Sequence, residues 1–210
     1  MLALLLKVLL SYLLGSVSGS MVLGAFRQVD IRDSGSGNAG GTNAFRTQGF
    51  WFAFGVVLID IGKGALAAWL FPQFEMAALG EAVPPEVQLL ACGFAAVVGH
   101  CYPLWYGFRG GKGAATAIGA LLIIQPSAVL PMLGVWIGVL LISGYVGLST
   151  VLAAISLLPA VAWLDESASR IAFAGLLAVF LTFTHRGNIR RLLDGTESRF
   201  ERVRIVNWFR

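Results

Sequence analysis

Long apolar runs make up most of this chain, and three polar segments interrupt them. A helix needs about 20 apolar residues to cross a bilayer. The apolar runs therefore predict helices at roughly these ranges: 2–26, 48–71, 87–105, 114–125, 127–143, 145–163 and 168–185. The run 114–125 is short, so a half-helix or a re-entrant piece is the alternative there. The pattern predicts an all-α integral membrane protein, a bundle of about seven transmembrane helices in a single domain, residues 1–210.

The polar segments are residues 30–46, 99–116 and 185–197, which we call the first, second and third polar segments. They contain both histidines of the chain and many of its glycines and arginines. Glycine lets the backbone approach a ligand closely, and exposed backbone N–H groups together with Arg and Lys favour anions. The three segments therefore predict a phosphate-handling site at a membrane surface.

Composition supports the membrane location, because 57% of the 210 residues are hydrophobic and only 12% are charged. Soluble domains contain about a quarter charged residues. The first apolar run, Met1 to Phe26, is too long for the core of a signal peptide, so we expect a retained helix. Cys92 and Cys101 lack the spacing of metal ligands, and we expect them to fill small apolar spaces.

The charges are distributed unevenly and predict the topology. Most arginines and lysines lie in or beside the polar segments and in the C-terminal tail, whereas acidic residues occupy the other connectors: Glu75, Glu81, Glu86, Asp165 and Glu166. By the positive-inside rule the polar segments and the C-terminus face the cytoplasm and the N-terminus lies outside. Residues 198–210 alternate Arg with apolar residues, which suggests an interfacial tail or, alternatively, a frayed one. Because the basic residues lie between apolar spans, we expect no nucleic-acid partner.

The first polar segment contains Gly35-Ser-Gly-Asn-Ala-Gly40, which fits the spacing G-x-G-x-x-G. A dinucleotide fingerprint requires a strand before it, whereas a transmembrane helix is expected here. The small residues leave backbone N–H groups accessible, and Arg46 adds a planar fork suited to phosphate. Further hydrogen-bonding side chains are Ser36, Asn38, Thr42 and Asn43. The segment therefore predicts anion binding, with a simple flexible turn as the alternative.

The second polar segment contains Gly110-Gly-Lys-Gly113 and resembles a P-loop. The required glycine is missing five residues before Gly111, and no Ser or Thr follows Lys112. The segment therefore implies neither a nucleoside triphosphate nor Mg²⁺, and we expect no metal and no cofactor. Lys112 before a helix still favours an anion, because its charge adds to the positive end of the helix dipole.

The third polar segment begins with His185 and Asn188, which share a face if the last apolar helix continues through them. His100 is expected at a matching depth, as a functional group or as a hydrogen-bonded cap. Asp60 and Lys63 lie inside the second apolar run, where lone charges are costly, so we expect a structural pair or a polar network behind the site. The hydroxyls near the start of the sixth run either reach the site or bond their own helix backbone.

These motifs, taken in order, resemble one family: the bacterial acyl-phosphate:glycerol-3-phosphate acyltransferases of the PlsY type. The matching positions are Gly35 to Asn38, Gly40, Thr42, Asn43 and Arg46; Gly99, His100, Pro103 and Gly110 to Gly113; and His185, Asn188, Ile189, Arg191, Leu192, Gly195 and Glu197. The other large glycerolipid acyltransferase family uses an H-x-x-x-x-D pair, and neither histidine of this chain has an Asp at that spacing.

The resemblance implies a seven-helix enzyme of the bacterial cytoplasmic (inner) membrane with its site facing the cytoplasm. It implies transfer of a fatty acyl group from acyl phosphate to the 1-hydroxyl of glycerol 3-phosphate, with an upstream enzyme that supplies the acyl phosphate. The catalytic residues it implies are Ser36, Arg46, Lys112, His185 and Asn188. The substrate- and phosphate-binding residues it implies are Gly35, Gly37, Asn38, Gly40, Thr42, Asn43, Gly110, Gly111, Gly113 and Thr150.

Two positions depart from the family pattern, because Thr150 and Gly147 stand where the resemblance leads us to expect serines. The alternative function is a small membrane transporter for a phosphorylated metabolite. The charged Asp60 and Lys63 and the short run 114–125 would fit such a transporter.

Overall fold

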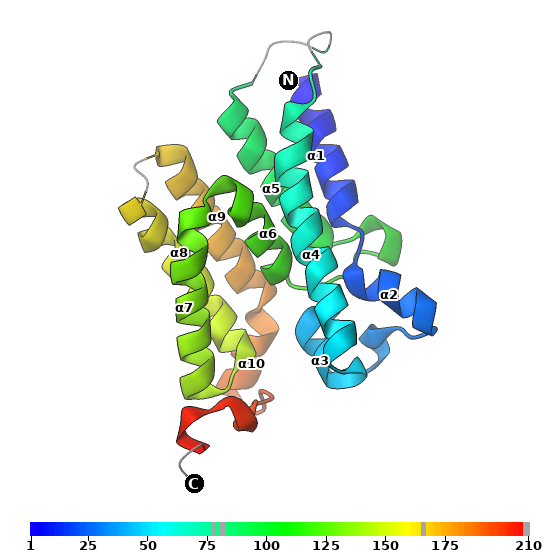
Figure 1. Ribbon diagram of the computed structural model, residues 1–210, viewed down its shortest axis with the longest axis vertical. Coiled ribbons are helices and arrows are strands. Elements are labelled where there is room, and N and C mark those ends of the chain that lie inside the picture. Colours follow the sequence, from blue (N-terminus) through cyan, green and yellow to red (C-terminus); the bar gives the residue numbers. More distant parts are fainter. Residues whose placement is uncertain (77–78, 80–82, 165–166, 208–210) are drawn as a thin grey trace. The chain divides into compact units, whose positions relative to one another are not determined.

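The computed structural model describes residues 1–76, 79, 83–164 and 167–207, and within these ranges the regular structure is entirely helical (Figure 1). The connector charges Glu81, Asp165 and Glu166 and the last residues of the expected interfacial tail, 208–210, lie outside the described residues. The α-helices are α1 (Leu2–Gly15), α2 (Gly19–Arg27), α3 (Gly41–Gln48), α4 (Phe50–Leu70), α5 (Pro85–Cys101), α6 (Ala114–Ile124), α7 (Pro126–Ser143), α8 (Val146–Leu164), α9 (Ala168–Thr184) and α10 (Arg186–Leu193). Short 3₁₀ turns are η1 (Ile31–Asp33), η2 (Phe71–Gln73), η4 (Leu104–Tyr106), η5 (Glu201–Val203) and η6 (Ile205–Asn207).

Among the described residues, five helical segments are long and apolar enough to cross a membrane, and a sixth is added if α9 and α10 count as one span bent by 55°. The prediction of an all-helical integral membrane protein is therefore confirmed at this level. The short run at 114–125 forms the short apolar helix α6, which does not reach the length of a full span.

The expected first helix is interrupted, since the segment Leu2–Arg27 consists of α1 and α2 with a break at residues 16–18. At the break the hydroxyl of Ser16 donates to the carbonyl oxygen of Tyr12 at 2.9 Å. The backbone N–H of Gly19, which begins α2, donates to Oδ1 of Asp60 at 3.1 Å. A carboxylate at a helix N-terminus is favourable, so Asp60 stabilises the new helix start.

The expected run 48–71 is confirmed as the single helix α4, and Gly49 separates this helix from α3. Its φ of +84° lies in the region that glycine adopts at little cost, and the chain changes direction there.

The chain divides into two compact units, Met1–Ile124 and Gln125–Arg210, which are described separately. In the first unit α4 packs against α1, α2, α3, α5 and α6. Helices α4 and α6 approach closely, since a Cβ on Gly64 would overlap the carbonyl oxygen of Thr116 and one on Gly119 would overlap that of Ile61. Small residues at such crossings let helix backbones pack closely within a membrane.

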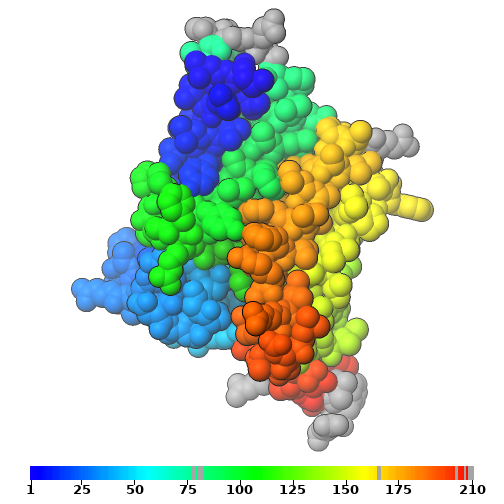
Figure 2. Space-filling view, turned by 180° about the vertical axis from the view of Figure 1, so that it is seen from behind, coloured from blue at the N-terminus to red at the C-terminus, as the bar shows by residue number. Residues whose placement is uncertain are grey.

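In the second unit α8 packs against both α7 and α9, and α10 contacts α8 and α9. Figure 2 shows α9 and α10 following one another, from orange to red, on one face of this unit. The beginning of α8 and the end of α9 therefore lie at the same end of the second unit, beside α10.

Candidate functional site

The first polar segment folds around the side chain of Asn43, which is only 1% exposed. Its Oδ1 accepts a hydrogen bond from the backbone N–H of Ser36 at 2.9 Å, and its Nδ2 donates to the carbonyl oxygens of Ile31 and Ser34 at 2.8 and 3.1 Å. Both amide protons of Asn43 are thus used inside the loop. A Cβ on Gly35 would overlap Asn43 Oδ1, so the glycine permits this arrangement. Asn43 therefore supports the loop from within.

Ser36 and Arg46 lie on the outer surface of the same segment and are exposed. Arg46 belongs to α3 and follows Asn43 by three residues, so it lies roughly one helical turn further along. The remaining expected residues of this segment lie on the loop or in the first turn of α3: Gly37, Asn38, Gly40 and Thr42. The segment thus presents a hydroxyl and a guanidinium beside a glycine-rich backbone, which suits an anionic ligand.

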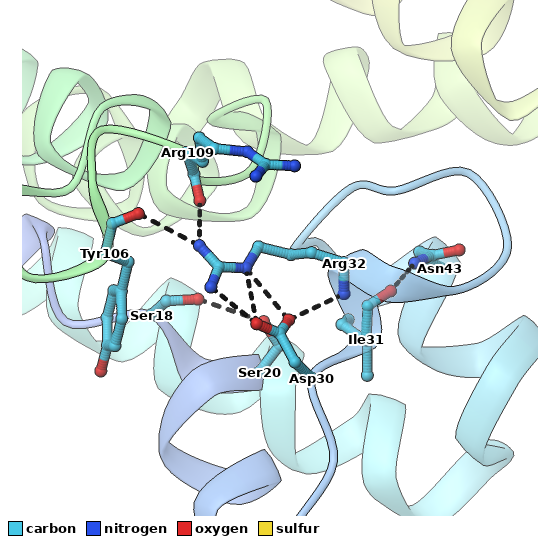
Figure 3. A network of polar contacts seen from close by, with 8 residues as sticks. All are labelled: Ser18, Ser20, Asp30, Ile31, Arg32, Asn43, Tyr106 and Arg109. Carbon is cyan, nitrogen blue, oxygen red and sulfur yellow. Dashed lines mark hydrogen bonds and ion pairs between the residues drawn. The ribbon is translucent and has the colours of Figure 1, made fainter.

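The side chain of Arg32 connects the first and second polar segments (Figure 3). Its Nε and Nη2 donate to the carboxylate of Asp30, with a shortest contact of 2.6 Å from Nη2 to Oδ2. Its Nη1 donates to the carbonyl oxygens of Tyr106 and Arg109, both at 3.1 Å. The hydrogen bonds from Arg32 lower the pKa of Asp30, and the same bonds raise the pKa of Arg32.

Sequence reasoning counted Arg32 only as a basic residue and missed this connection. No pattern in the sequence indicated that Arg32 would reach the carbonyl groups of Tyr106 and Arg109, more than seventy residues away.

The second polar segment folds back onto the end of α5. The N–H of Gly110 donates to the carbonyl oxygen of Cys101 at 3.2 Å, and the N–H of Gly111 donates to that of His100 at 3.1 Å. A Cβ on Gly110 would overlap the His100 carbonyl oxygen, and one on Gly111 would overlap the His100 imidazole. The two glycines are therefore required for this close approach.

Lys112 is half-buried and lies two residues before the first residue of α6, as the sequence predicted for an anion site at a helix N-terminus. Gly113 has a φ of +90° and its carbonyl oxygen accepts the N–H of Ala117 at 2.8 Å. The left-handed conformation of Gly113 thus turns the chain directly into the helix.

A buried polar network lies among α4, α5 and the break between α1 and α2. Lys63 Nζ is 3.0 Å from Asp60 Oδ1, so the expected pairing of these two residues is confirmed. The same amine is 2.7 Å from the carbonyl oxygen of Val17 and 2.9 Å from Nδ1 of His100. All three side chains are at most 5% exposed. The pair therefore extends into a network that ends at the imidazole beneath Gly111.

In the second unit His185 is buried at the junction of α9 and α10, with Nδ1 2.8 Å from the carbonyl oxygen of Leu181. His185 and Asn188 were expected to share a face if the last apolar helix continued through them, and that condition is not met, because the helix bends by 55° here. His185 ends α9 through its own N–H and begins α10 through its carbonyl oxygen, which accepts the N–H groups of Asn188 and Ile189 at 2.8 and 3.0 Å.

The carboxylate of Glu197 holds Asn188 in place. Asn188 Nδ2 donates to Glu197 Oε1 at 2.6 Å, and Arg191 Nε donates to Glu197 Oε2 at 2.7 Å. On the other side, a Cβ on Gly147 would lie 2.7 Å from both Cβ and Nδ2 of Asn188. The glycine where a serine was expected thus leaves space that the Asn188 side chain occupies.

The hydroxyls near the start of α8 bond their own helix backbone, which was one of the two alternatives. Ser149 Oγ donates to the carbonyl oxygen of Tyr145 at 2.8 Å, and Thr150 Oγ1 donates to that of Val146 at 2.9 Å. Thr150 Oγ1 also accepts the indole N–H of Trp136 at 3.1 Å. Thr150 is 7% exposed.

The structure thus joins the first two polar segments within the first unit and gathers His185, Asn188 and Gly147 within the second. Among the described residues, no group of three or more His, Cys, Asp or Glu side chains could hold a metal ion. Membrane-spanning helices that end in glycine-rich loops with Lys, Arg and His side chains define a class: an integral membrane protein with loops suited to anionic ligands.

Within that class, the chain belongs to the glycerol-3-phosphate acyltransferase family, whose model matches residues 5–195. It is 38% identical to the glycerol-3-phosphate acyltransferase of Chlorobaculum tepidum, over 95% of this chain and 97% of that relative. It is 41% identical to that of Salinibacter ruber, over 90% of this chain and 89% of the relative.

Two crystal structures of PlsY (YgiH), an integral membrane glycerol 3-phosphate acyltransferase, are also similar. The glycerol 3-phosphate form is 34% identical with a TM-score of 0.82, covering 94% of this chain and 95% of that one. The lysophosphatidic acid form is 32% identical with a TM-score of 0.82, covering 97% of this chain and 98% of that one.

Proposed function

We propose that this protein transfers a fatty acyl group from acyl phosphate to the 1-hydroxyl of glycerol 3-phosphate. The products are lysophosphatidate and inorganic phosphate, and the reaction is the first step of phospholipid synthesis. The observation that carries the proposal is family membership over residues 5–195, a range that includes the first two polar segments and residues 185–195 of the third. The relatives compared above are named as acyltransferases, and they give no support to the transporter alternative.

The proposed topology has seven crossings in one acyltransferase domain, with α6 as the short one. The N-terminus lies outside, and the active site and the C-terminus face the cytoplasm of a bacterial inner membrane. The cluster of basic residues in the polar segments supports this orientation. We expect an upstream enzyme to supply the acyl phosphate.

We propose that the described residues of the tail, 198–207, lie on the lipid headgroups. Arg199 Nε donates to the carbonyl oxygen of Ser143 at 2.8 Å, and the Arg199 guanidinium lies 4.8 Å from the ring centre of Tyr145. The N–H of Phe200 donates to the carbonyl oxygen of Gly144 at 2.8 Å. These contacts support an ordered start of the tail at the turn between α7 and α8.

The reaction depends more on holding the two substrates in position than on acid catalysis. An acyl phosphate is a mixed anhydride, so its phosphate leaves readily as the hydroxyl oxygen attacks the carbonyl carbon. Lys112 and Arg46 would neutralise the charge of the substrate phosphates. Ser36 would act as an anion ligand rather than as a nucleophile. Holding alcohol and carbonyl in contact supplies several kcal/mol of the barrier reduction.

The proton of the attacking hydroxyl has two candidate acceptors. One is His185, whose Nδ1 bond to Leu181 leaves Nε2 as the basic nitrogen of the neutral ring. The other is a substrate phosphate, because the second pKa of a phosphomonoester is about 6. We favour the phosphate, with His185 and Asn188 orienting glycerol 3-phosphate.

The test is an assay of the purified protein in detergent. We expect release of inorganic phosphate from acyl phosphate only when glycerol 3-phosphate is present, with lysophosphatidate formed in equal amount by mass spectrometry. Phosphate release that is the same with and without glycerol 3-phosphate, or no release at all, would rule out the reaction. A trapped acyl-Ser36 intermediate would overturn the proposed role of Ser36, and full activity of His185→Ala would remove His185 from the mechanism.

A further inference from the structure

The N–H donors of the Lys63 ammonium group determine which ring nitrogen of His100 carries the proton. An ammonium group has three N–H donors and no acceptor. In the part of the chain that the structure describes, three acceptor atoms lie within hydrogen-bond distance of Lys63 Nζ: the carbonyl oxygen of Val17 at 2.7 Å, Asp60 Oδ1 at 3.0 Å and His100 Nδ1 at 2.9 Å. Each proton of Lys63 therefore has one acceptor, and His100 Nδ1 is one of them.

The alternative proton positions conflict with the same distances. His100 Nδ1 is also 3.4 Å from Asp60 Oδ1. If Nδ1 carried a proton for Asp60, that N–H would face an N–H of Lys63 across 2.9 Å. A doubly protonated ring would add a second positive charge to a buried cluster that Asp60 and Lys63 already balance. His100 is therefore neutral with its proton on Nε2.

The Nε2 side of the ring faces the second polar segment. Nε2 is the atom nearest to the position that a Cβ on Gly111 would take. The same histidine accepts the N–H of Gly111 with its carbonyl oxygen at 3.1 Å. His100 thus accepts a backbone hydrogen bond from Gly111 and packs its ring against the same glycine, one residue before Lys112.

We propose that His100 is a positioning residue, held in its Nε2-protonated form by Lys63 and Asp60, which keeps the Gly110–Gly113 loop in place to bind a substrate phosphate. The kinetic part of this proposal rests on the proposed acyltransferase reaction. The proton position does not depend on that reaction and can be measured in its absence.

His185 provides an internal reference, since the chain has only two histidines. Nδ1 of His185 is 2.8 Å from the carbonyl oxygen of Leu181, and a carbonyl oxygen only accepts. In the neutral state the two rings therefore carry their protons on opposite nitrogens.

The first experiment is ¹⁵N NMR of histidine-labelled protein in detergent, at a pH where both rings are neutral. We expect the ¹⁵N signals of one ring protonated at Nε2, which are lost in His100→Gln. We expect the signals of a second ring protonated at Nδ1, which are lost in His185→Gln. A His100 signal protonated at Nδ1, or at both nitrogens, would overturn the proposal.

The second experiment compares two substitutions of His100. Glutamine places an N–H near the position of Nε2, whereas asparagine reaches only the position of Nδ1. We expect His100→Asn to raise the KM of the substrate whose phosphate binds the Gly110–Gly113 loop by about tenfold to a hundredfold, because small misplacements at active sites have effects of this size. We expect His100→Gln to raise the same KM less. That substrate should be the one whose KM rises in Lys112→Gln. Equal effects of the two variants, or an effect on the other substrate, would contradict the positioning role.

A third variant covers the case in which His100→Asn does not fold. Gly111→Ala retains the histidine but inserts a Cβ against its ring, so the same KM should rise. An unchanged KM in Gly111→Ala would count against the proposal. If the wild-type protein lacks the acyltransferase reaction, the proposed function fails, while the ¹⁵N signals still decide the proton position.

Discussion

Arg32 joins two loops that are far apart in the sequence. It forms a fork with Asp30 on one side and donates to the carbonyl oxygens of Tyr106 and Arg109 on the other. The guanidinium presents five donors in a fixed plane, whereas an ammonium is a compact charge that cannot reach both sides at once. The planar group, more than its charge, therefore holds the first two polar segments together.

We expect Arg32→Lys to lower kcat/KM by about tenfold, since small shifts of binding loops are costly in catalysis. The measurement is the coupled release of phosphate and lysophosphatidate. Arg109→Lys is the matched control, because Arg32 contacts only the backbone of Arg109 and that carbonyl group is retained. Equal losses in both variants would argue against the connection.

The Asp30–Arg32 pair should also make stability depend on pH in the acid range. The pKa of Asp30 is lower in the folded protein, so its contribution is present above the unfolded pKa and is lost as pH falls through the folded pKa. We expect the difference in thermal unfolding temperature between the wild type and Asp30→Asn to shrink below about pH 4. Parallel curves for the two proteins down to low pH would contradict this.

At the residue scale the sequence predicted the glycines, Lys112 and His185 as site residues because each occurs within a short motif. It missed the loop-supporting role of Asn43 and the connection through Arg32. Both depend on which backbone carbonyl or N–H group lies nearby after folding, and spacing alone does not contain that information. The pairing of Asp60 with Lys63 was predictable, since it is local, but the contact to His100 was not.

The helices themselves followed from the apolar runs, but their interruptions did not. Hydropathy continues through residues 16–18, and the break there is accompanied by a hydrogen bond to the distant carboxylate of Asp60. The break at Gly49 lies at the predicted start of a run, and the sequence did not indicate that residues 41–48 before it form α3. The bend at His185 was likewise not predictable from hydropathy, because it arises where one residue both ends α9 and begins α10.

Two glycines of α4 provide a paired test of helix packing. A Cβ on Gly64 would overlap the backbone oxygen of Thr116, whereas Gly62 has open space around it. We expect Gly64→Ala to destabilise the protein by roughly 1–3 kcal/mol, the usual cost of overpacking. Gly62→Ala should be neutral or slightly stabilising, since alanine is the better helix former. Thermal unfolding in detergent measures both, and similar values for the two would refute the close α4–α6 approach.

At the scale of the whole molecule, composition alone was enough to predict a helical membrane protein, because lipid requires every backbone group to be bonded within the chain. The family followed from three motifs in a fixed order, which local chemistry separated from a dinucleotide fold and a P-loop. The number of membrane crossings could not be predicted as clearly from the sequence, because α6 is shorter than a full span.

Orientation in the membrane can be checked by cysteine labelling of intact cells. The native Cys92 and Cys101 are buried and should react little with an impermeant maleimide. We expect Glu75→Cys to react from outside the cell, and Ser198→Cys to react only after the cytoplasmic side is opened. The reverse pattern would invert the proposed topology.

Lys7 of α1 has a consequence for how the protein is made. Its side chain is buried, and Nζ donates to the carbonyl oxygen of Pro72 at 2.9 Å and to Oε1 of Gln88 at 2.6 Å. An amine in hydrocarbon is costly until such acceptors reach it. Both acceptors leave the ribosome long after α1, so α1 cannot settle until α4 and the start of α5 arrive. The order of assembly in the membrane thus differs from the order of synthesis.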